Sequence, residues 1–269
     1  MISITRPDHV RYKQWMKAQT AHGRHKSGLY LIESRKLVAE ALAAGVELQN
    51  VILREDAWET WEETKSLAAA RGRLQNWEED LPFVSLAANL FDRLASSQTP
   101  DGILAVATLP ARDPVPRRLK GRVLILDHLQ DPGNVGTLLR SAEAFGFKSV
   151  LGFESADFYA PKTLRSAMGS TFRLDLYAAH QASVDAWHEA MGLFWWGADL
   201  KGFDVRRVTW PEEFALVIGN EGRGLSPAVI ARLHETVTIP MQKVESLNAA
   251  VSGSLLMGLA ALERHSGNR

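Results

Sequence analysis

The sequence of 269 residues contains no cysteine. This absence excludes disulfide bonds, thiolate metal ligands and a cysteine nucleophile, and it is typical of proteins in the reducing cytoplasm. The first residues contain no apolar core of the kind that a signal peptide needs, so we expect none. The most apolar stretch, residues 249–262, contains two glycines and is too short to span a bilayer, so we expect a buried helix there.

The chain also lacks net charge, because 31 basic residues balance 31 acidic ones. The protein as a whole is therefore not a polyelectrolyte that binds nucleic acid by charge alone. Residues 1–36 differ from the rest, with eight basic residues against Asp8 and Glu33. A nucleic-acid partner would select such a segment, but a solvated surface helix has the same composition and is slightly favoured by charge alone. No set of histidine and acidic residues has the spacing of a metal site, so we expect no metal.

Alternating strands and helices occupy both sides of a proline-rich segment. Three prolines fall within seven positions of residues 110–116, which predicts a semi-rigid linker over residues 109–120. Residues 1–108 read as a small α/β domain. Residues 121–269 read as a doubly wound α/β domain with a parallel sheet, because runs such as Leu216–Ile218 are apolar on both faces.

The second domain shows the clearer pattern. We expect strands at residues 123–126, 149–153, 172–177, 193–196, 214–218 and 236–239. We expect helices near residues 135–145, 161–168, 184–189, 227–233 and 246–264. In parallel sheets ligands bind in the loops that follow the carboxyl ends of the strands, so those loops are the place to look for a site.

Three of these loops are unusual. In residues 131–140, a Pro-Gly pair marks a turn, Asn134 is suited to cap the next helix, and Arg140 follows within two helical turns. Residues 219–226 contain three glycines in six positions, which leaves backbone amides free to face a ligand. Residues 240–248 are polar and connect a buried strand to the last helix. Together these loops predict one ligand site.

A dinucleotide-binding enzyme is one alternative. Gly133-Asn134-Val135-Gly136 follows a strand and opens a helix, and Glu154 lies where a ribose-binding acid is expected. However, the fingerprint Gly-x-Gly-x-x-Gly has only its last glycine spacing here. This alternative also leaves the loops at residues 219–226 and 240–248 without a role, so it is the weaker one.

The three loops resemble the motifs of the TrmH/SpoU family of SPOUT-class RNA methyltransferases. The first motif is present as Asn134, Gly136 and Arg140, the second as Gly219-Asn220-Glu221-Gly222-x-Gly224-Leu225-Ser226, and the third as Ile239-Pro240-Met241 followed by Ser246-Leu247-Asn248. The match covers residues 121–264, and residues 165–170 resemble a further family segment. Residues 32–35 and 101–103 resemble the family's substrate-binding domain, although Glu33-Ser34 stands where relatives often have Glu-Gly.

This resemblance implies a fold and a function. The fold is an N-terminal, ribosomal-protein-like α/β domain followed by a C-terminal α/β domain with a parallel sheet and a deep trefoil knot. The family forms homodimers through the C-terminal domain and binds S-adenosyl-L-methionine. The implied activity is 2′-O-methylation of ribose in RNA, with ribosomal RNA preferred and transfer RNA left open. A non-catalytic RNA-binding protein of the same fold is the alternative from another class.

The resemblance also assigns residues. The positions implied to bind the cofactor are Gly219, Ile239, Leu247, Met241 and Ile218. The catalytic set is Arg140, with Asn134, Glu221, Ser246 and Asn248 as the polar wall of the site. A guanidinium stays protonated, so Arg140 would clamp a phosphate and stabilise developing alkoxide charge rather than act as a free base. On this view the cofactor lies mainly against the two later loops, and residues 134–140 face the RNA.

Several of these residues have a plainer alternative role. Capping a helix competes with a catalytic role for Asn134 and for Ser246. Core packing competes with cofactor contact for Ile239 and Leu247. His128 precedes the first motif, and we interpret it as a structural or surface histidine rather than a general base. The pair at residues 195–196 could stack on bases, but core packing is the default for tryptophans in a strand.

Overall fold

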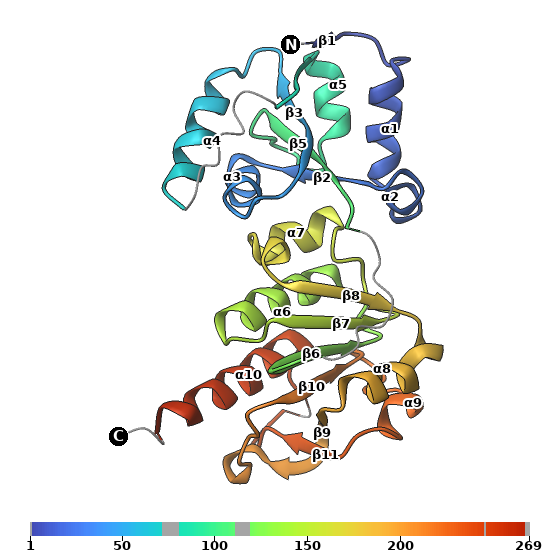
Figure 1. Cartoon of the computed structure of the whole chain (residues 1–269), viewed down its shortest axis with the longest axis vertical. Coiled ribbons are helices and arrows are strands. Elements are labelled where there is room, and N and C mark those ends of the chain that lie inside the picture. Colours follow the sequence, from blue (N-terminus) through green and yellow to red (C-terminus); the bar gives the residue numbers. More distant parts are fainter. Residues whose placement is uncertain (1, 72–80, 111–118, 245, 267–269) are drawn as a thin grey trace. The chain divides into compact units, whose positions relative to one another are not determined.

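The computed structural model describes residues 2–71, 81–110, 119–244 and 246–266 of the chain. The chain divides into two compact units (Figure 1). Unit 1 comprises residues 1–111 together with residues 159–172, and unit 2 comprises residues 112–158 and 173–269. Most of the predicted linker, residues 111–118, lies outside the described residues. The domain boundaries read from the sequence therefore stay a prediction.

Unit 1 is built on a five-stranded sheet in the order β1-β4-β3-β5-β2. Its strands are β1 (Ile2–Ile4), β2 (Leu29–Glu33), β3 (Leu48–Arg54), β4 (Phe83–Leu86) and β5 (Ile103–Thr108). Strand β5 runs antiparallel to β2 and β3, and the other pairs are parallel. Side chains alternate between two apolar cores: Leu31 and Ile52 join one, and their neighbours Ile32 and Leu53 join the other.

Helices cover both faces of this sheet (Figure 1). Helices α1 (Val10–Ala18) and α5 (Ala88–Leu94) cover one face, and α2 (Ala21–Ser27) follows α1. Helices α3 (Arg35–Ala43), α4 (Glu59–Ala69) and α7 (Pro161–Ala167) cover the other face. Helices α1 and α2 are separate, because the hydroxyl of Thr20 accepts the N–H of Gly23 at 3.1 Å and caps α2.

Ser34 caps α3, and its hydroxyl accepts the N–H of Leu37 at 3.4 Å. Its backbone φ is +92°, in the left-handed region that favours glycine. A non-glycine residue there is strained. This conformation gives a physical reason why a Glu-Gly pair would suit the position.

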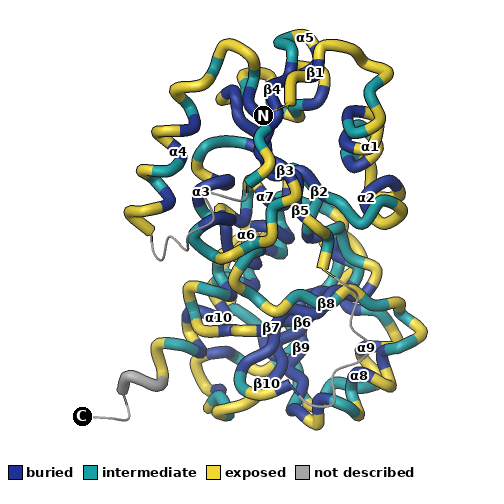
Figure 2. Tube along the Cα trace, turned by 45° about the horizontal axis from the view of Figure 1, so that its top comes forward, coloured by how far each residue is buried: buried dark blue, intermediate teal, exposed yellow. Residues whose placement is uncertain are grey.

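Unit 2 is built on a six-stranded sheet in the order β11-β9-β10-β6-β7-β8. Its strands are β6 (Arg122–Asp127), β7 (Ser149–Phe153), β8 (Asp175–Ala179), β9 (Phe194–Asp204), β10 (Phe214–Gly219) and β11 (Glu235–Thr238). All the pairings between these strands are parallel, which confirms the predicted sheet. The central strands are buried along nearly their whole length (Figure 2). Strand β9 extends to Asp204, well beyond the predicted end at Trp196.

Two helices cover each face of the unit 2 sheet. Helices α6 (Pro132–Ala144) and α10 (Ala249–Ser266) lie on one face, and α8 (Val184–Met191) and α9 (Pro227–Ile230) lie on the other (Figure 1). Helix α10 approaches the sheet closely, because a Cβ atom on Gly253 would lie 2.5 Å from Leu138 Cδ2 and 3.1 Å from Ile218 Cγ1. The expected trefoil knot stays a prediction. Among the described helices, none is long and apolar enough to cross a membrane.

The remaining predicted boundaries of unit 2 shift by a few residues. The strand expected at residues 172–177 begins at Asp175, because Ser170–Phe172 forms a 3₁₀ turn (η2). The helix expected from Ser246 begins at Ala249. The helix expected over residues 135–145 begins three residues earlier, at Pro132. These shifts matter because they decide which polar side chains cap helices and which are available to the site.

Candidate active site

The loops that carry the three motifs meet at one edge of the unit 2 sheet. Gly219 at the end of β10 is paired in register with Asp127 at the end of β6, and Asp127 is paired with Phe153 at the end of β7. Strand β6 leads into α6 on one face of the sheet, whereas β10 leads into α9 on the other face. The first and second motif loops therefore leave the sheet side by side and diverge.

Asn248, Asn134 and Glu221 connect the three motif loops in one hydrogen-bonded chain. Asn248 Nδ2 donates to Asn134 Oδ1 at 3.1 Å, and Asn134 Nδ2 donates to Glu221 Oε1 at 3.1 Å. At the far end, Asn248 Oδ1 accepts the backbone N–H groups of Ala250 at 2.8 Å and Val251 at 3.2 Å and so caps α10. Backbone donors at one end and a carboxylate at the other determine the orientation of both side-chain amides.

Glu221 fastens the second motif loop to the first. Its Oε1 accepts the N–H of Asp131 at 3.2 Å, and its Oε2 accepts the N–H of Gln130 at 3.4 Å. Partial burial by itself raises the pKa of Glu221. The hydrogen bonds to the carboxylate outweigh that effect and hold the pKa below its usual value of 4.5; they come from its own backbone, from the Asn134 side chain and from the two loop N–H groups. The carboxylate is therefore charged at neutral pH.

Asp131, and not Asn134, caps α6. The Asp131 carboxylate accepts the backbone N–H of Asn134 at 2.9 Å, and Pro132 occupies the first turn, where its missing N–H costs nothing. The predicted capping role of Asn134 is wrong, because the helix begins at Pro132 and is capped by Asp131. Asn134 stands inside the first turn, and its side-chain amide joins Asn248 to Glu221. Ser246 does not cap α10 either, because Asn248 does.

A cavity of about 470 Å³ opens beside this chain of side chains. Its wall comes from the middle of β9, from the ends of β10 and β11 and from the start of α10. It includes all the residues expected to bind a cofactor, namely Gly219, Ile239, Leu247, Met241 and Ile218. Glu221 and Ser246 also line it, whereas Asn134, Arg140 and Asn248 are not among its described lining residues. Its volume suits a small-molecule ligand.

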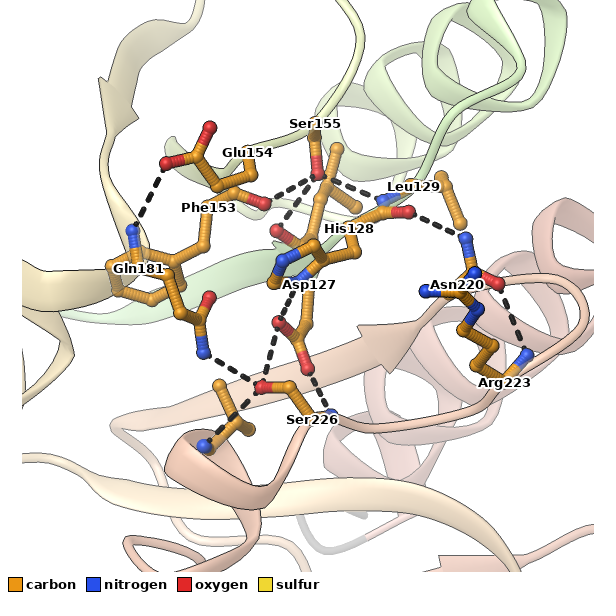
Figure 3. A network of polar contacts seen from close by, with 12 residues as sticks. Asp127, His128, Leu129, Phe153, Glu154, Ser155, Gln181, Asn220, Arg223 and Ser226 are labelled. Carbon is orange, nitrogen blue, oxygen red and sulfur yellow. Dashed lines mark hydrogen bonds and ion pairs between the residues drawn. The ribbon is translucent and has the colours of Figure 1, made fainter.

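The second motif loop is shaped by one close backbone approach. Asn220 and Gly224 exchange two backbone hydrogen bonds of 2.9 and 3.0 Å. A Cβ atom on Gly219 would lie 2.5 Å from the carbonyl carbon of Gly224, so only glycine fits there. The Asn220 side chain accepts the N–H groups of Gly222 and Arg223, both at 3.0 Å, and donates to the carbonyl of His128 at 2.7 Å (Figure 3). The loop is thus preformed.

Sequence reasoning missed the contribution of β9 to the cavity. Asp199, Leu200 and Lys201 line the cavity from the middle of that strand, where its pairing with β11 shifts register, and all three are exposed. They were missed because the strand was ended at Trp196, before the polar stretch that follows. A polar stretch after a buried parallel strand was the available signal. Asn220 and Arg223 were inside the recognised motif but were assigned no role.

Asp127 was also missed, and it is a completely buried carboxylate at the end of β6. It accepts the backbone N–H of Ser226 at 2.6 Å and the Ser226 hydroxyl at 3.1 Å. Gln181 Nε2 donates to the same hydroxyl at 2.7 Å (Figure 3). These groups fill the crevice between β6 and β10, where a doubly wound sheet would place a dinucleotide. The geometry therefore favours the cavity at β9–β11 as the ligand site.

His128, Glu154 and the two tryptophans, which the sequence also raised as candidates, all make contacts within the protein. Nδ1 of His128 lies 2.9 Å from the buried carboxylate of Asp127. Glu154, the acid of the dinucleotide alternative, faces His180 Nδ1 at 3.1 Å and accepts the N–H of Gln181 at 3.3 Å. The hydrogen bond from His180 is the main reason why the pKa of Glu154 is lowered. The tryptophans at residues 195–196 are buried, which confirms their core role.

Arg140 lies on the exposed side of α6, six residues after Asn134. Within the described part of the chain, it makes no hydrogen bond or ion pair. A guanidinium carries its charge at any physiological pH and presents several donors in a rigid fork. Beside the motif loops, it is therefore available to an anionic ligand.

Comparison with known proteins agrees with this geometry. Residues 121–258 match the SpoU rRNA Methylase family, and residues 10–105 match the MRM3-like substrate binding domain.

The chain is 31% identical to the 23S rRNA (guanosine(2553)-2′-O)-methyltransferase RlmP of Bacillus subtilis, over 96% of this chain and 98% of that protein. It is 28% identical to the 23S rRNA (uridine(2479)-2′-O)-methyltransferase of Streptomyces viridochromogenes, over 96% of this chain and 91% of that protein. The crystal structure of the SpoU methyltransferase AviRb from Streptomyces viridochromogenes, in complex with the cofactor AdoMet, matches with a TM-score of 0.80 and 26% identity, over 96% of this chain and 100% of that chain.

Proposed function

We propose that this chain, which belongs to the SpoU rRNA methylase family, transfers a methyl group from S-adenosylmethionine to a ribose 2′-hydroxyl group of ribosomal RNA. One observation carries the proposal. Glu221 lines the cavity and also ends the chain of side chains that joins the three motif loops, so ligand site and motifs form one structure. The named activities of the relatives and the AdoMet in the AviRb complex support the choice of substrate and cofactor.

The residues of the cavity suit S-adenosylmethionine. Apolar side chains such as Ile218, Ile239 and Leu247 match an adenine ring, and the Glu221 carboxylate matches a cationic ligand. Lys201 adds a positive charge for the carboxylate of the methionine part. When bound, S-adenosylmethionine supplies a methyl group that its sulfonium already activates for transfer. The protein is then left with the tasks of binding, orientation and charge stabilisation.

Arg140 would perform the charge stabilisation. Its guanidinium has no competing carboxylate among the described residues, so it can bind the phosphate beside the target ribose. The same donors would stabilise negative charge that develops on the 2′-oxygen. Because a guanidinium does not give up its proton in proteins, Arg140 would not act as the base.

Asn134, Asn248 and Glu221 would act as positioning residues. Their polar atoms already satisfy one another, so their contribution is to hold the Arg140 helix against the cavity wall. Precise orientation of reactants accounts for a large share of the rate in reactions that need little covalent help. Ser246 lines the cavity and would contact ligand directly.

We also propose that the protein is a homodimer formed through α10. Helix α10 exposes Val251, Leu255, Leu259 and Leu262, with exposed fractions of 52%, 42%, 36% and 66%. Their spacing of three and four residues places them along one side of the helix. A continuous apolar stripe on a helix that already packs on its other side is typical of a subunit interface. The absence of cysteine supports a location in the reducing cytoplasm.

The test is methyl transfer to defined RNA. The protein is incubated with S-adenosylmethionine labelled in its methyl group and with one protein-free RNA in each reaction: 23S rRNA, 16S rRNA or transfer RNA. We expect label in ribosomal RNA, at a 2′-O-methyl position mapped by resistance of the linkage to alkali. Label in transfer RNA alone would replace the substrate assignment. Cofactor binding without label in any RNA would establish the non-catalytic alternative instead.

A further inference from the structure

Strand β11 lies at one edge of the unit 2 sheet and, among the described strands, pairs with β9 alone (Figure 1). It is four residues long, and its pairing with β9 shifts register between Thr236 and Val237. Val237 and Thr238 line the cavity, and the chain continues from them to Ile239 in the same wall. The shape of the cavity therefore depends on how firmly a short, irregularly paired strand is held against β9.

His234, the residue before β11, holds the start of that strand through two hydrogen bonds to Trp195 of β9. Its backbone N–H donates to the carbonyl of Trp195 at 3.0 Å, and its Nδ1 accepts the N–H of Trp195 at 3.0 Å. The ring nitrogen takes the place of the carbonyl that a neighbouring strand offers in a regular ladder. The preceding residue, Leu233, also packs on β9, because a Cβ atom on Gly197 would lie 2.5 Å from Leu233 Cδ1.

Only an imidazole without a proton on Nδ1 can make the second of these bonds. A ring nitrogen that accepts a hydrogen bond carries no proton, so the proton of His234 is on Nε2. The protonated ring has two donors and no acceptor, and histidine is the side chain that changes charge between about pH 5 and 8. Trp195 is completely buried, so protonation of His234 would leave the Trp195 N–H without this acceptor and away from water.

Two rings lie against the imidazole of His234. The ring of Phe194 on β9 has its centroid 4.4 Å away, and the ring of His188 on α8 stacks on it at 5.5 Å. Burial is the main cause that lowers the pKa of His188, and the positive charges of His234 and Arg232 lower it further. His188 is therefore neutral at neutral pH.

The charged groups near the two histidines come from α8, from the segment before β11 and from β11 itself. Arg232, two residues before His234, pairs with Asp185 of α8 at 2.7 Å, so this carboxylate already has a cation. The other acidic residues of these elements are Glu189 on α8 and Glu235 on β11. Within the described part of the chain, neither forms a hydrogen bond or an ion pair with His234. Protonation would thus break one bond of His234 without a carboxylate partner to replace it.

We infer that His234 is a pH-sensitive clamp, which holds β11 against β9 while its imidazole is neutral and releases the start of β11 when it is protonated. The released strand carries one wall of the cavity, so S-adenosylmethionine affinity falls as the pH falls through the titration range of histidine. The inference rests on the proposed function, because it takes the cofactor as the ligand of this cavity. The two charge states of one side chain then correspond to a binding form and a weakly binding form of the site.

The test compares His234→Asn with His234→Ala in the full-length chain. The side-chain oxygen of asparagine can accept the Trp195 N–H and does not titrate, whereas alanine offers no acceptor. S-adenosylmethionine affinity is measured by calorimetry at about pH 8 and about pH 5.5, above and below the ordinary titration of histidine. On acidification we expect the wild type to lose about three- to tenfold in affinity and His234→Asn to lose less than about twofold. His234→Ala should bind weakly at both pH values.

His22→Asn is the matched control for the loss of a histidine. His22 is exposed on α2 in unit 1 and is not among the described residues that line the cavity. This variant should keep the pH dependence of the wild type, which also carries any titration of the cofactor itself. The same pH dependence in His234→Asn would overturn the inference.

Hydrogen exchange of the Trp195 amide tests the clamp without the cofactor. After correction for the intrinsic effect of pH on exchange, protection of this amide in the wild type should fall by about tenfold on acidification. In His234→Ala protection should be low at both pH values, and equal protection in this variant and the wild type would contradict the clamp. If no variant bound S-adenosylmethionine at either pH, the proposed function would fail, whereas the exchange measurement would still decide whether His234 holds β11.

Discussion

The side-chain N–H of Asn248 donates a hydrogen bond of 3.1 Å to the side-chain oxygen of Asn134, which lies 114 residues earlier in the chain. Because Asn248 also caps α10 and Asn134 also donates to Glu221, this one bond joins the start of the last helix to the loops that follow β6 and β10. The site is therefore organised by the protein itself. Its parts should respond to mutation as a coupled unit.

Breaking the chain of side chains should destabilise unit 2. Asn134→Ala removes one partner from Asn248 and one from Glu221, and a lost hydrogen bond of this kind costs about 1 to 2 kcal/mol. The double variant with Asn248→Ala should lose less than the sum of the single variants, because the two residues share a bond. Urea denaturation measures the loss in free energy of unfolding for the two single variants and the double variant. Strictly additive losses would show that the bond between the two side chains contributes nothing.

Arg140→Ala should reduce kcat for methyl transfer by at least about 100-fold, the usual cost of removing one donor to developing charge. S-adenosylmethionine affinity, measured by calorimetry, should stay within about twofold because Arg140 does not line the cavity. Arg140→Lys keeps the positive charge but loses the planar arrangement of donors. Its kcat should therefore lie between those of the wild type and Arg140→Ala. As a control, Lys120→Ala removes an exposed charge before β6, at the opposite edge of the sheet, and should retain full activity. Normal turnover by Arg140→Ala would remove Arg140 from the mechanism.

Gly219→Ala should weaken S-adenosylmethionine binding by about tenfold or more. The added Cβ would lie 2.5 Å from the backbone of Gly224, and backbone atoms cannot move aside without opening the loop. Gly222→Ala is the matched control in the same loop, because its added Cβ would have only the Asn220 side chain near it, at 3.8 Å. Equal affinity losses in both variants would point to general loop sensitivity rather than to the close approach.

Glu221 should make stability depend on pH in the acid range. Its folded-state pKa is lower than the ordinary value of 4.5, so its stabilising contribution is fully present above pH 4.5 and is lost as pH falls through the folded-state pKa. The stability difference between wild type and Glu221→Gln should therefore be constant at neutral pH and shrink toward zero on acidification. Denaturation curves at a series of pH values check this. A difference that grows on acidification would contradict the assigned direction.

Leu255→Asp should convert the proposed dimer into a monomer. A carboxylate in the centre of the apolar stripe would have to be desolvated in the interface, which is costly without a partner. Sedimentation velocity measures the state directly. Ile230→Asp is the matched control, since Ile230 is also an exposed apolar residue, at 53% against 42% for Leu255, and lies on α9 on the opposite face of the sheet. A wild-type monomer, or dissociation of both variants, would exclude an interface through α10.

The sequence by itself determined the local features. Runs such as Leu216–Ile218, apolar on both faces, led to the parallel sheet, and the glycines and polar residues after its strands led to the motif loops. Each of these signals lies within a few consecutive residues. All the residues proposed to bind the cofactor also fall in one cavity wall, because the ends of parallel strands meet at one edge.

Only the tertiary structure decided which polar groups are free. Asn134 could cap a helix or join a network, and the choice depended on Asp131 taking the cap and on Asn248, far along the chain, taking its side chain. Arg24 and Lys26 look alike in the sequence, yet one is buried against α1 and the other is exposed. A polar group is satisfied by a hydrogen bond whether its partner is near or far in the sequence. A partner that is distant in the sequence produces no local sequence pattern, so it cannot be predicted from the sequence.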